Sequence, residues 1–390
     1  MVIVCVDGCD PEYIHRGFDE GIIPNIQRFF SDGFGTFGKA VVPTFTNPNN
    51  LSIVTGVPPS VHGISGNFFR DPVTGSAIMM DSPDLVRCET VISALENVGA
   101  KVAVVTAKDK LRRMFAKGIR DGVCFSAEKA GQCTLDEHGI EKVPDMLGLP
   151  VPDVYSAALS FFVLEAGLAL VNRHELDLLF LSLSDYVQHK YEPGSVVANA
   201  FFSEFDRLCG RFVDAGVTLA LTADHGMRAK KNVVFLQDVL DIEFGKEKTL
   251  VICPITDPYV AHHSALGSFV RVYTVGENPV TVQEIISRVR GIEAVYSRRV
   301  ACDKFSLPWD READLVVLGD RDTAIGGSIA QHDLSTLGGV PLRSHGGLGE
   351  QTVPFVISEK ICENYASESA LEKLRNFDIL DYALNGTLNV

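Results

Sequence analysis

The chain has 390 residues and a formal net charge of −15. Because nucleic-acid binding needs clustered Lys and Arg against phosphates, this charge argues against a nucleic-acid partner. The length exceeds one average domain and predicts a large domain with a smaller one attached or inserted. The nine cysteines include no CxxC pair, which argues against a disulfide framework or a cysteine zinc site and indicates a reducing compartment.

The chain begins with an apolar, strand-like run rather than a targeting segment. Residues 2–6 lead directly into Asp7, with no basic region ahead of a long apolar stretch. The longest apolar stretch, residues 157–171, contains Glu165 and is too short to cross a bilayer. We therefore expect a cytoplasmic protein with no membrane partner, and the sequence leaves a monomer and a homodimer open.

Four short apolar runs stop abruptly at a polar or charged residue. Such runs are typical of strands buried on both faces of a parallel sheet. Helical patterns alternate with them, which predicts an α/β fold with a mostly parallel central sheet and helices on both faces. Ligands of such folds bind beyond the carboxyl ends of the strands. The runs are 2–6 before Asp7, 102–107 before Lys108, 178–184 before Asp185 and 217–223 before Asp224, and the helical patterns are 22–30, 90–98, 154–171 and 197–215.

The segment 238–342 has a different character and predicts a smaller α+β cap domain inserted into the main one. The main domain would then consist of residues 1–237 and 343–390, with a shorter insertion at about 68–150. Expected elements of the cap and of the chain after it are strands at 269–275 and 314–318, a helix at 280–289, a returning strand at 353–357 and a terminal helix at 371–384.

The stretch TFTNPNNLSIVTG predicts a helix whose N-terminus carries a hydroxyl group. Asn47 is the expected N-cap, Pro48 fits the first turn, and Gly56 is expected to end the helix. Backbone N–H groups at a helix N-terminus favour an anion. Thr46 is therefore the candidate nucleophile, with Thr44 as the less favoured alternative.

Three later motifs combine carboxylate and imidazole side chains. Asp185 and His189 are four residues apart, which places them on one side of a helical turn. Asp224 and His225 are adjacent at a strand end, and His345 lies in the turn-forming sequence SHGG. Together with Asp7, which follows the first apolar run, these residues supply six nitrogen and oxygen ligands.

Six such ligands suffice for two metal sites. Imidazole and carboxylate without thiolate favour catalytic zinc, with manganese or iron as alternatives. Two divalent cations would lower the pKa of the Thr46 hydroxyl and stabilise a leaving group. An acidic chain could in this way bind an anionic substrate.

Each of these residues also has an ordinary structural interpretation. An Asp at a strand end often caps a helix, and an isolated His is more often a structural hydrogen-bonding group. We apply the structural interpretation to His15, His62, His138, His174 and His332, and favour it for His262 and His263.

The order of these motifs resembles the alkaline phosphatase superfamily, and within it the nucleotide pyrophosphatase/phosphodiesterase branch. The motifs are an early DG, PTxTxPN followed by TG and HG, then SxxDxxxH, ADHG and a late HGG. The resemblance implies an alkaline phosphatase-like fold, Thr46 as the nucleophile, and Asn67 as a donor to a phosphoryl oxygen. It also implies one metal held by Asp185, His189 and His345, and a second held by Asp7, Thr46, Asp224 and His225.

Two details differ from the diesterases and are similar to the phosphonoacetate hydrolase family: the TNPNN form of the nucleophile motif and the KDK at a strand end. In that family two lysines spaced by one residue hold the substrate carboxylate, which corresponds to Lys108 and Lys110. The implied reaction hydrolyses the C–P bond of phosphonoacetate to acetate and phosphate through a phospho-threonine. A nucleotide pyrophosphatase/phosphodiesterase with the same di-metal core, a non-catalytic metal-binding relative and a merely solvated lysine pair stay open as alternatives.

Overall fold

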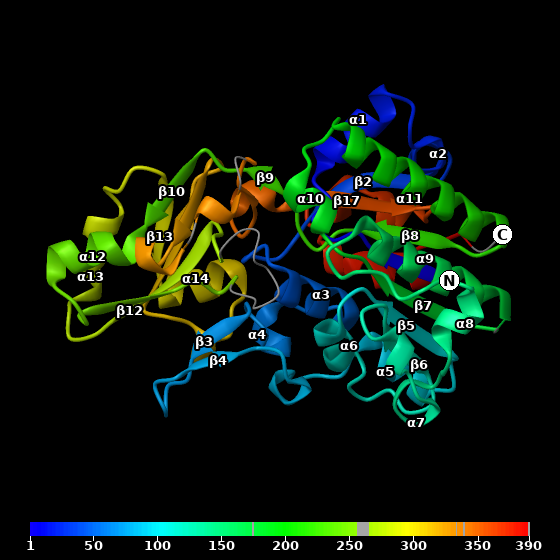
Figure 1. The fold of residues 1–390 in the computed structure, drawn as a ribbon, viewed down its shortest axis with the longest axis horizontal. Coiled ribbons are helices and arrows are strands. Elements are labelled where there is room, and N and C mark those ends of the chain that lie inside the picture. The colour runs from blue at the N-terminus through cyan, green and yellow to red at the C-terminus, as the bar shows by residue number, and fades with distance from the viewer. Residues whose placement is uncertain (174, 256–264, 333, 338–339, 389–390) are drawn as a thin grey trace.

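A computed structural model describes the chain except residues 174, 256–264, 333, 338–339 and 389–390. Its main feature is a seven-stranded sheet in the order β2-β17-β8-β1-β7-β5-β6 (Figure 1). The five strands from β8 to β6 run parallel, and β17 is antiparallel to both of its neighbours. The strands are β1 Val2–Cys5, β2 Phe34–Lys39, β5 Val102–Thr106, β6 Val123–Ser126, β7 Leu178–Ser182, β8 Leu219–Thr222 and β17 Thr352–Ile357.

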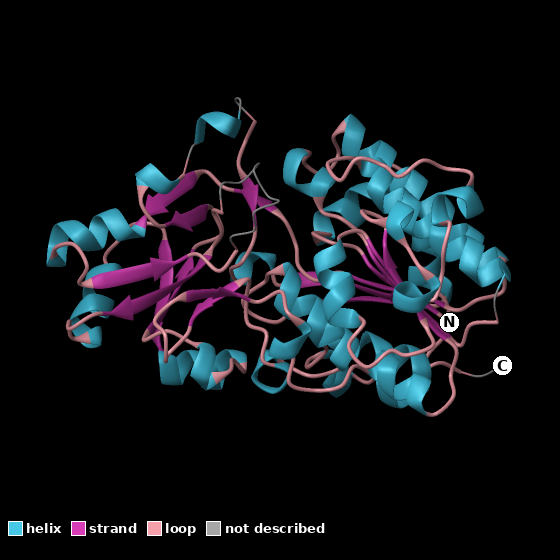
Figure 2. Cartoon of the chain, turned by 60° about the horizontal axis from the view of Figure 1, so that its bottom comes forward, coloured by secondary structure: helices cyan, strands magenta, loops and turns pink. Residues whose placement is uncertain are grey.

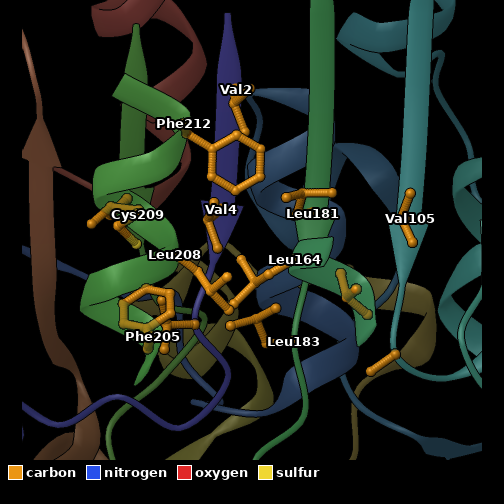
Figure 3. Close-up of a cluster of buried hydrophobic side chains, with 14 of the residues drawn as sticks. Val2, Val4, Val105, Leu164, Leu181, Leu183, Phe205, Leu208, Cys209 and Phe212 are labelled. Carbon is orange, nitrogen blue, oxygen red and sulfur yellow. The ribbon is translucent and has the colours of Figure 1, made fainter. Parts of the chain in front are cut away.

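Helices cover both faces of this sheet, and its central strands β1, β5, β7 and β8 are buried along their whole length. In β1, Val2 and Val4 face one core, whereas Ile3 and Cys5 face the other. Figure 3 shows the first core, where Leu164 and Phe212 reach towards the strands. The helices over this face are α1 Pro11–Asp19, α2 Pro24–Asp32, α9 Ala157–Arg173 and α11 Val196–Asp214, and those over the other are α3 Thr46–Thr55, α5 Val91–Asn97, α6 Asp109–Phe115 and α17 Ile379–Asn385.

A second, four-stranded antiparallel sheet lies apart from the first, in the order β11-β12-β14-β13 (Figure 2). It has its own apolar core, in which Val270 and Val272 pack with Val282 and Ile286. Its other face packs partly against the larger part of the molecule, since Phe269 shares a cluster with Phe45. Its elements are β11 Thr249–Ile252, β12 Phe269–Thr274, β13 Ile292–Ser297 and β14 Leu315–Gly319, with helices α12 Leu236–Phe244, α13 Pro279–Ile286 and α14 Arg298–Phe305.

The remaining elements are short. Three pairs of strands form small two-stranded sheets: β3 Phe68–Arg70 with β4 Ala77–Met79, β9 Arg228–Ala229 with β16 Arg343–Ser344, and β10 Asn232–Phe235 with β15 Thr323–Gly326. The short helices are α4 Pro59–His62, α7 Leu135–His138, α8 Val143–Leu147, α10 Tyr186–Lys190, α15 Glu363–Ala366 and α16 Glu368–Leu371.

The predicted α/β class with a mostly parallel central sheet is confirmed, and two finer expectations are wrong. Residues 68–150 are not set apart as an insertion, because β5 and β6 lie within them and belong to the main sheet. The terminal helix expected at 371–384 is broken: Arg375 is extended, with φ −114° and ψ 152°. The break lets Asn376 turn inward and donate to the carbonyl of Ala223, at 3.1 Å.

The described part of the chain contains no helix that combines the length and the apolar character needed to cross a bilayer. The apolar α9 is instead buried against the central sheet.

Candidate active site

The predicted strand-end residues meet at one edge of the central sheet. β8, β1, β7 and β5 are consecutive neighbours and parallel, so their carboxyl ends lie side by side. These ends are followed by Asp224, Asp7, Asp185 and Lys108 in the same spatial order. Asp185 precedes the short helix α10, and its backbone carbonyl accepts from the N–H of His189 at 3.0 Å. The one-turn spacing predicted for these two residues is therefore confirmed.

Thr46 is the first residue of α3, as the anion-binding argument required. Its Oγ1 lies 3.2 Å from Nε2 of His225. The helix ends at Gly56 in the left-handed conformation, as predicted. The expected N-cap is wrong: Phe45 precedes the first turn, and Asn47 already lies inside the helix, where its Nδ2 donates to the carbonyl of Met80 at 3.0 Å.

Thr44, the alternative nucleophile, uses its hydroxyl for hydrogen bonds to the protein backbone. It is fully buried, and its hydroxyl donates to the carbonyl of Gly347 at 2.9 Å. The same oxygen accepts from the N–H of Gly346 at 2.9 Å. Thr44 thereby ties the segment before α3 to the turn that carries His345.

The three histidines share one arrangement: each ring uses Nδ1 for a backbone carbonyl. Nδ1 of His189 lies 3.0 Å from the carbonyl oxygen of Arg343, and Nδ1 of His345 lies 2.7 Å from that of Thr44. Nδ1 of His225 lies 2.9 Å from the carbonyl oxygen of Gly226. Since a carbonyl can only accept, these contacts place a ring proton on Nδ1, so that Nε2 can offer its lone pair to a metal ion. This is the tautomer with which histidine binds metals through Nε2.

The Nε2 atoms point towards the carboxylates. Nε2 of His189 lies 2.9 Å from Oδ2 of Asp185, and Nε2 of His225 lies 3.4 Å from Oδ1 of Asp7. The rings of His225 and His345 stack at a centroid distance of 3.7 Å with an interplanar angle of 9°. Burial, together with the neighbouring imidazoles, holds the pKa of His345 well below its ordinary value, so this ring is neutral near pH 7.

The three carboxylates are buried close together, which strongly perturbs them in the metal-free protein. Burial and the charges of Asp185 and Asp224 raise the pKa of Asp7 well above its ordinary value. Burial is the main cause that raises the pKa of Asp224 to about 7, and the charge of Asp185 acts in the same direction. Burial also opposes ionisation of Asp185, but the charges of His189 and Lys108 outweigh it and hold its pKa well below normal. Such mutual repulsion is relieved when cations bind.

These residues fit divalent metal ions. Ligand atoms of Asp185, His189 and His345 lie within 4.8 Å of one another, and so do those of Asp7, Asp185 and His225. Oδ1 of Asp7 is buried and accepts no hydrogen bond from any residue that the structure describes. Asp185 thus belongs to both groups, whereas the family resemblance assigned it to only one of the two metals. The third expected carboxylate, Asp224, is near as well, with its Oδ2 3.5 Å from Nε2 of His225.

A pocket opens beside the metal-binding groups and contains the remaining predicted site residues. Lys108 and Lys110 line it together with Thr46 and Asn67. Nζ of Lys108 lies 3.6 Å from Oδ1 of Asp185. Lys108 immediately precedes α6 and Lys110 lies in its first turn. The sequence therefore identified two lysines that share one pocket with the candidate nucleophile. The other lining residues are Asp7, Phe45, Leu111, Leu183, Asp185, Ile255 and His345.

Sequence reasoning missed two residues that hold the site together. Asn50 donates through Nδ2 to Oδ2 of Asp224 at 3.0 Å and to the carbonyl of Thr46 at 3.1 Å. Its spacing of one helical turn from Thr46 could have suggested this role. The buried guanidinium of Arg343 donates to carbonyls of Gln188 and Met227, at 2.7 and 3.1 Å, and no local sequence pattern indicates it.

The other histidines lie outside this cluster as far as the structure describes them. Nε2 of His62 lies 2.9 Å from Oγ of Ser52, and Nδ1 of His138 accepts from the N–H of Thr134 at 3.2 Å. His332 accepts from the N–H of Gly327 at 2.9 Å, and His15 packs edge-on against Phe37. These contacts match the structural interpretation, and His174, His262 and His263 lie outside the described residues.

Comparison with known proteins assigns the fold and site to a class. The family model of type I phosphodiesterase / nucleotide pyrophosphatase matches residues 1–346, and the chain belongs to this family. An uncharacterized pyrophosphatase/phosphodiesterase of Schizosaccharomyces pombe is 26% identical over 247 residues, which cover 58% of this chain and 44% of that protein. The chain thus matches less than half the length of that curated relative.

Within this class, the chain is similar over nearly its whole length to one solved enzyme. Phosphonoacetate hydrolase from Sinorhizobium meliloti 1021, in complexes with phosphonoacetate and with phosphonoformate, is 44% identical with a TM-score of 0.94, covering 99% of this chain and 95% of that one. A phosphonoacetate hydrolase of Penicillium oxalicum is 68% identical over 28 residues, or 7% of this chain and 39% of that protein. These matches confirm the resemblance to phosphonoacetate hydrolases inferred from the sequence.

Proposed function

We propose that this protein hydrolyses the C–P bond of phosphonoacetate, giving acetate and phosphate. The observation that carries the proposal is that Lys108 and Lys110 line the same pocket as Thr46 and Asn67, beside the carboxylate and histidine groups. A substrate that carries both a phosphoryl group and a carboxylate matches a pocket lined by both metal-binding residues and lysines. The similarity to the enzyme from Sinorhizobium meliloti supports the same substrate.

We propose two zinc ions as cofactors, with manganese or iron as alternatives. The three Nε2 lone pairs and the buried Oδ1 of Asp7 fit such ions, and the donor set of imidazole and carboxylate favours zinc. Asp185, His189 and His345 would hold one ion, and Asp7, Thr46, Asp224 and His225 the other. When bound, the ions supply positive charge that lowers the pKa of a bound hydroxyl or water and stabilises phosphoryl oxygens.

Thr46 is the nucleophile of the proposed reaction. Its Oγ1 gives up its proton to solvent and forms a bond to phosphorus while the C–P bond breaks, which leaves a phospho-threonine and a carbanion equivalent of acetate. The electron pair of the broken bond moves onto the methylene carbon and is delocalised into the carboxylate, and the carbon takes its proton from solvent. Water then attacks the phospho-threonine, which releases phosphate and restores the hydroxyl of Thr46.

The other pocket residues stabilise charge in this reaction. Asn67 donates from its side-chain amide to a phosphoryl oxygen, where charge increases as the new bond forms. Lys108 and Lys110 neutralise the substrate carboxylate, which strengthens its capacity to accept the electron pair. Because the lysines act only on a substrate that has a carboxylate, they would set specificity for such substrates.

The test is to incubate the zinc-loaded protein with phosphonoacetate and to follow acetate and phosphate by NMR. Equal amounts of both products, at a rate well above that with a nitrophenyl phosphodiester, are expected. Rapid diester hydrolysis with negligible acetate release would instead support a nucleotide pyrophosphatase/phosphodiesterase with the same core. Absence of turnover on both substrates by a protein that binds divalent metal would support the non-catalytic metal-binding alternative, and absence of metal uptake would contradict both enzyme hypotheses.

We further propose that residues 238–342 form a cap domain on a main domain of residues 1–237 and 343–390. The separate four-stranded sheet and its own apolar core support this division. We also propose a cytoplasmic location, which rests on the cysteine pattern.

A further inference from the structure

Strand β12 of the smaller sheet contacts three separate parts of the active site. The N–H of Ser268, just before the strand, donates to the carbonyl of His345 at 2.9 Å. Phe269 packs edge-on against Phe45, the neighbour of the candidate nucleophile, at a ring-centroid distance of 6.0 Å. Arg271 reaches the segment that carries Asn67. The smaller sheet therefore supports the metal-binding turn, the nucleophile helix and the phosphoryl-binding segment.

Arg271 makes the strongest of these connections. It is fully buried and forms an ion pair with the equally buried Glu312, with Nε 2.7 Å from Oε1 and Nη2 2.9 Å from Oε2. The rest of its guanidinium crosses to the larger part of the molecule. Nη1 donates to the carbonyl of Phe68 at 3.0 Å, and Nη2 donates to the carbonyl and to Oγ of Ser65, both at 2.9 Å.

These bonds flank Asn67 on both sides in the sequence. The backbone of Asn67 is itself held, since its N–H donates to the carbonyl of Pro254 at 2.6 Å and its carbonyl accepts from the N–H of Met80 at 2.7 Å. The glycine between Ser65 and Asn67 permits this close approach: a Cβ at Gly66 would lie 3.0 Å from Nη1 of Arg271. Asn67 is thus presented to the pocket by a backbone that one buried arginine fixes on both sides.

We infer that Arg271 is a positioning residue for phosphoryl transfer, which acts by fixing the backbone on both sides of Asn67. The inference rests on the proposed function, because Asn67 has a catalytic role only if the pocket binds a phosphoryl group. A guanidinium suits this role because its planar fork can satisfy Glu312 and two separate carbonyls at once. An amide donor that is displaced by even 1 Å stabilises a transition state much less.

The experiment is a double-mutant cycle between Arg271 and Asn67. Replacing the arginine alone would leave the Glu312 carboxylate buried without its partner, so the variant is R271M/E312Q, which removes both charges together. It is combined with N67A, and kcat/KM for phosphonoacetate is measured on zinc-loaded protein. We expect R271M/E312Q to lower kcat/KM by about 10- to 100-fold when Asn67 is present, and by less than about 3-fold in the N67A background.

A matched control uses the ion pair between Arg298 and Asp314, whose nitrogen and oxygen atoms lie 2.8 Å apart in the same smaller sheet. The variant R298M/D314N should leave kcat/KM within about 2-fold of wild type, since this pair bonds to Thr274 of β12 and to Ala313 just before β14. The conservative variant R271K keeps the charge beside Glu312 but not the fork. It should lose less activity than R271M/E312Q. If the circular dichroism spectrum of R271M/E312Q shows that this variant is unfolded, R271K replaces it in the cycle.

Equal losses in both backgrounds would overturn the inference, because Arg271 would then act on the structure in general. No loss with Asn67 present would overturn it as well. Failure of the proposed function has a different signature, namely a wild-type protein without turnover of phosphonoacetate. The same cycle would in that case be measured with a nitrophenyl phosphodiester, since the coupling concerns the phosphoryl group that both substrates contain.

Discussion

Two groups of residues line or adjoin the pocket and are built in different ways: the carboxylates and histidines with Thr46, called the metal-binding end, and Lys108 and Lys110, called the lysine end. The metal-binding end combines side chains from three strand ends, the start of α3 and the turn after β16, and each histidine is fixed through Nδ1 to a backbone carbonyl. The lysine end comes from one short segment at the start of α6. The side chain of His225 is 0% exposed, whereas that of Lys108 is 24% exposed. The metal-binding end is part of the buried core. The lysine end is partly exposed, so its lysines can be substituted without disturbing that core.

This difference suggests a division of labour. Phosphoryl transfer depends on distances between several buried groups, so it belongs to the rigid end. Choice of substrate depends on two charges that face an open pocket, so it belongs to the lysine end. The predictions that follow test whether effects on the two ends separate in this way.

Removal of the metals should have the largest effect. Chelation, or the variant Asp185→Asn, is expected to reduce turnover of every substrate by on the order of 10³-fold or more, since Asp185 belongs to both ligand groups. Metal analysis should find about two divalent ions in the wild type and fewer in the variant. Asp206→Asn, which changes a buried carboxylate between α2 and α11, is the control and should keep both metals.

Thr46→Ala should abolish turnover while leaving the metals bound. On the proposal that this hydroxyl is the nucleophile, we expect a loss on the order of 10³-fold or more on both classes of substrate. Thr44→Ser preserves the buried hydroxyl at the alternative position and should remain active. A near-normal rate for Thr46→Ala would move the nucleophile to Thr44 or to water.

The two lysines should differ slightly in their effects. Lys110→Ala should lower kcat/KM for phosphonoacetate by about 10- to 100-fold and leave diester hydrolysis nearly unchanged, because it removes only a partner of the carboxylate. Lys108→Ala should also affect the diester modestly, since its Nζ lies 3.6 Å from Asp185. Lys101→Ala, at an exposed ion pair remote from the pocket, should change neither rate. Identical profiles for all three variants would remove the proposed specificity role.

The smallest effect concerns pH and the metal-free protein. The pKa of Asp224 is raised from 3.8 to about 7, so the folded apo protein binds this proton more tightly than the unfolded chain does. Stability of the apo protein should therefore fall as pH rises from about 4 through 7. Metal binding needs the ionised carboxylate and strengthens over the same range. The Tm difference between zinc-loaded and chelated protein should accordingly increase from pH 5 to pH 8, and a constant difference would contradict the assignment of Asp224 as a ligand.

The sequence predicted which residues lie together at the carboxyl ends of the strands better than it predicted the connections that support them. Asp7, Asp185 and Asp224 could be found because each ends an apolar run, and parallel strands bring such ends together. The cap on α3 was misassigned because Asn47 has the right residue type but its side chain is bonded to Met80, which is distant in sequence.

Long-range contacts set the limit of such prediction. Arg271 lies about 200 positions from the segment that it holds, and no periodicity links the two. The role of Asp185 in both ligand groups likewise depends on three-dimensional distances that spacing does not contain. The break before α17 arises because Asn376 bonds to the main sheet, although the local pattern favours a continuous helix.

The most direct test of the division between the two ends is the ratio of kcat/KM for phosphonoacetate to that for a nitrophenyl phosphodiester, measured for the wild type and for Lys108→Ala/Lys110→Ala, both with two zinc ions bound. We predict that the ratio falls by about 10²-fold or more in the double variant, while diester turnover stays within about 10-fold of wild type. An unchanged ratio, with both activities reduced equally, would contradict the assignment of substrate choice to the lysine end.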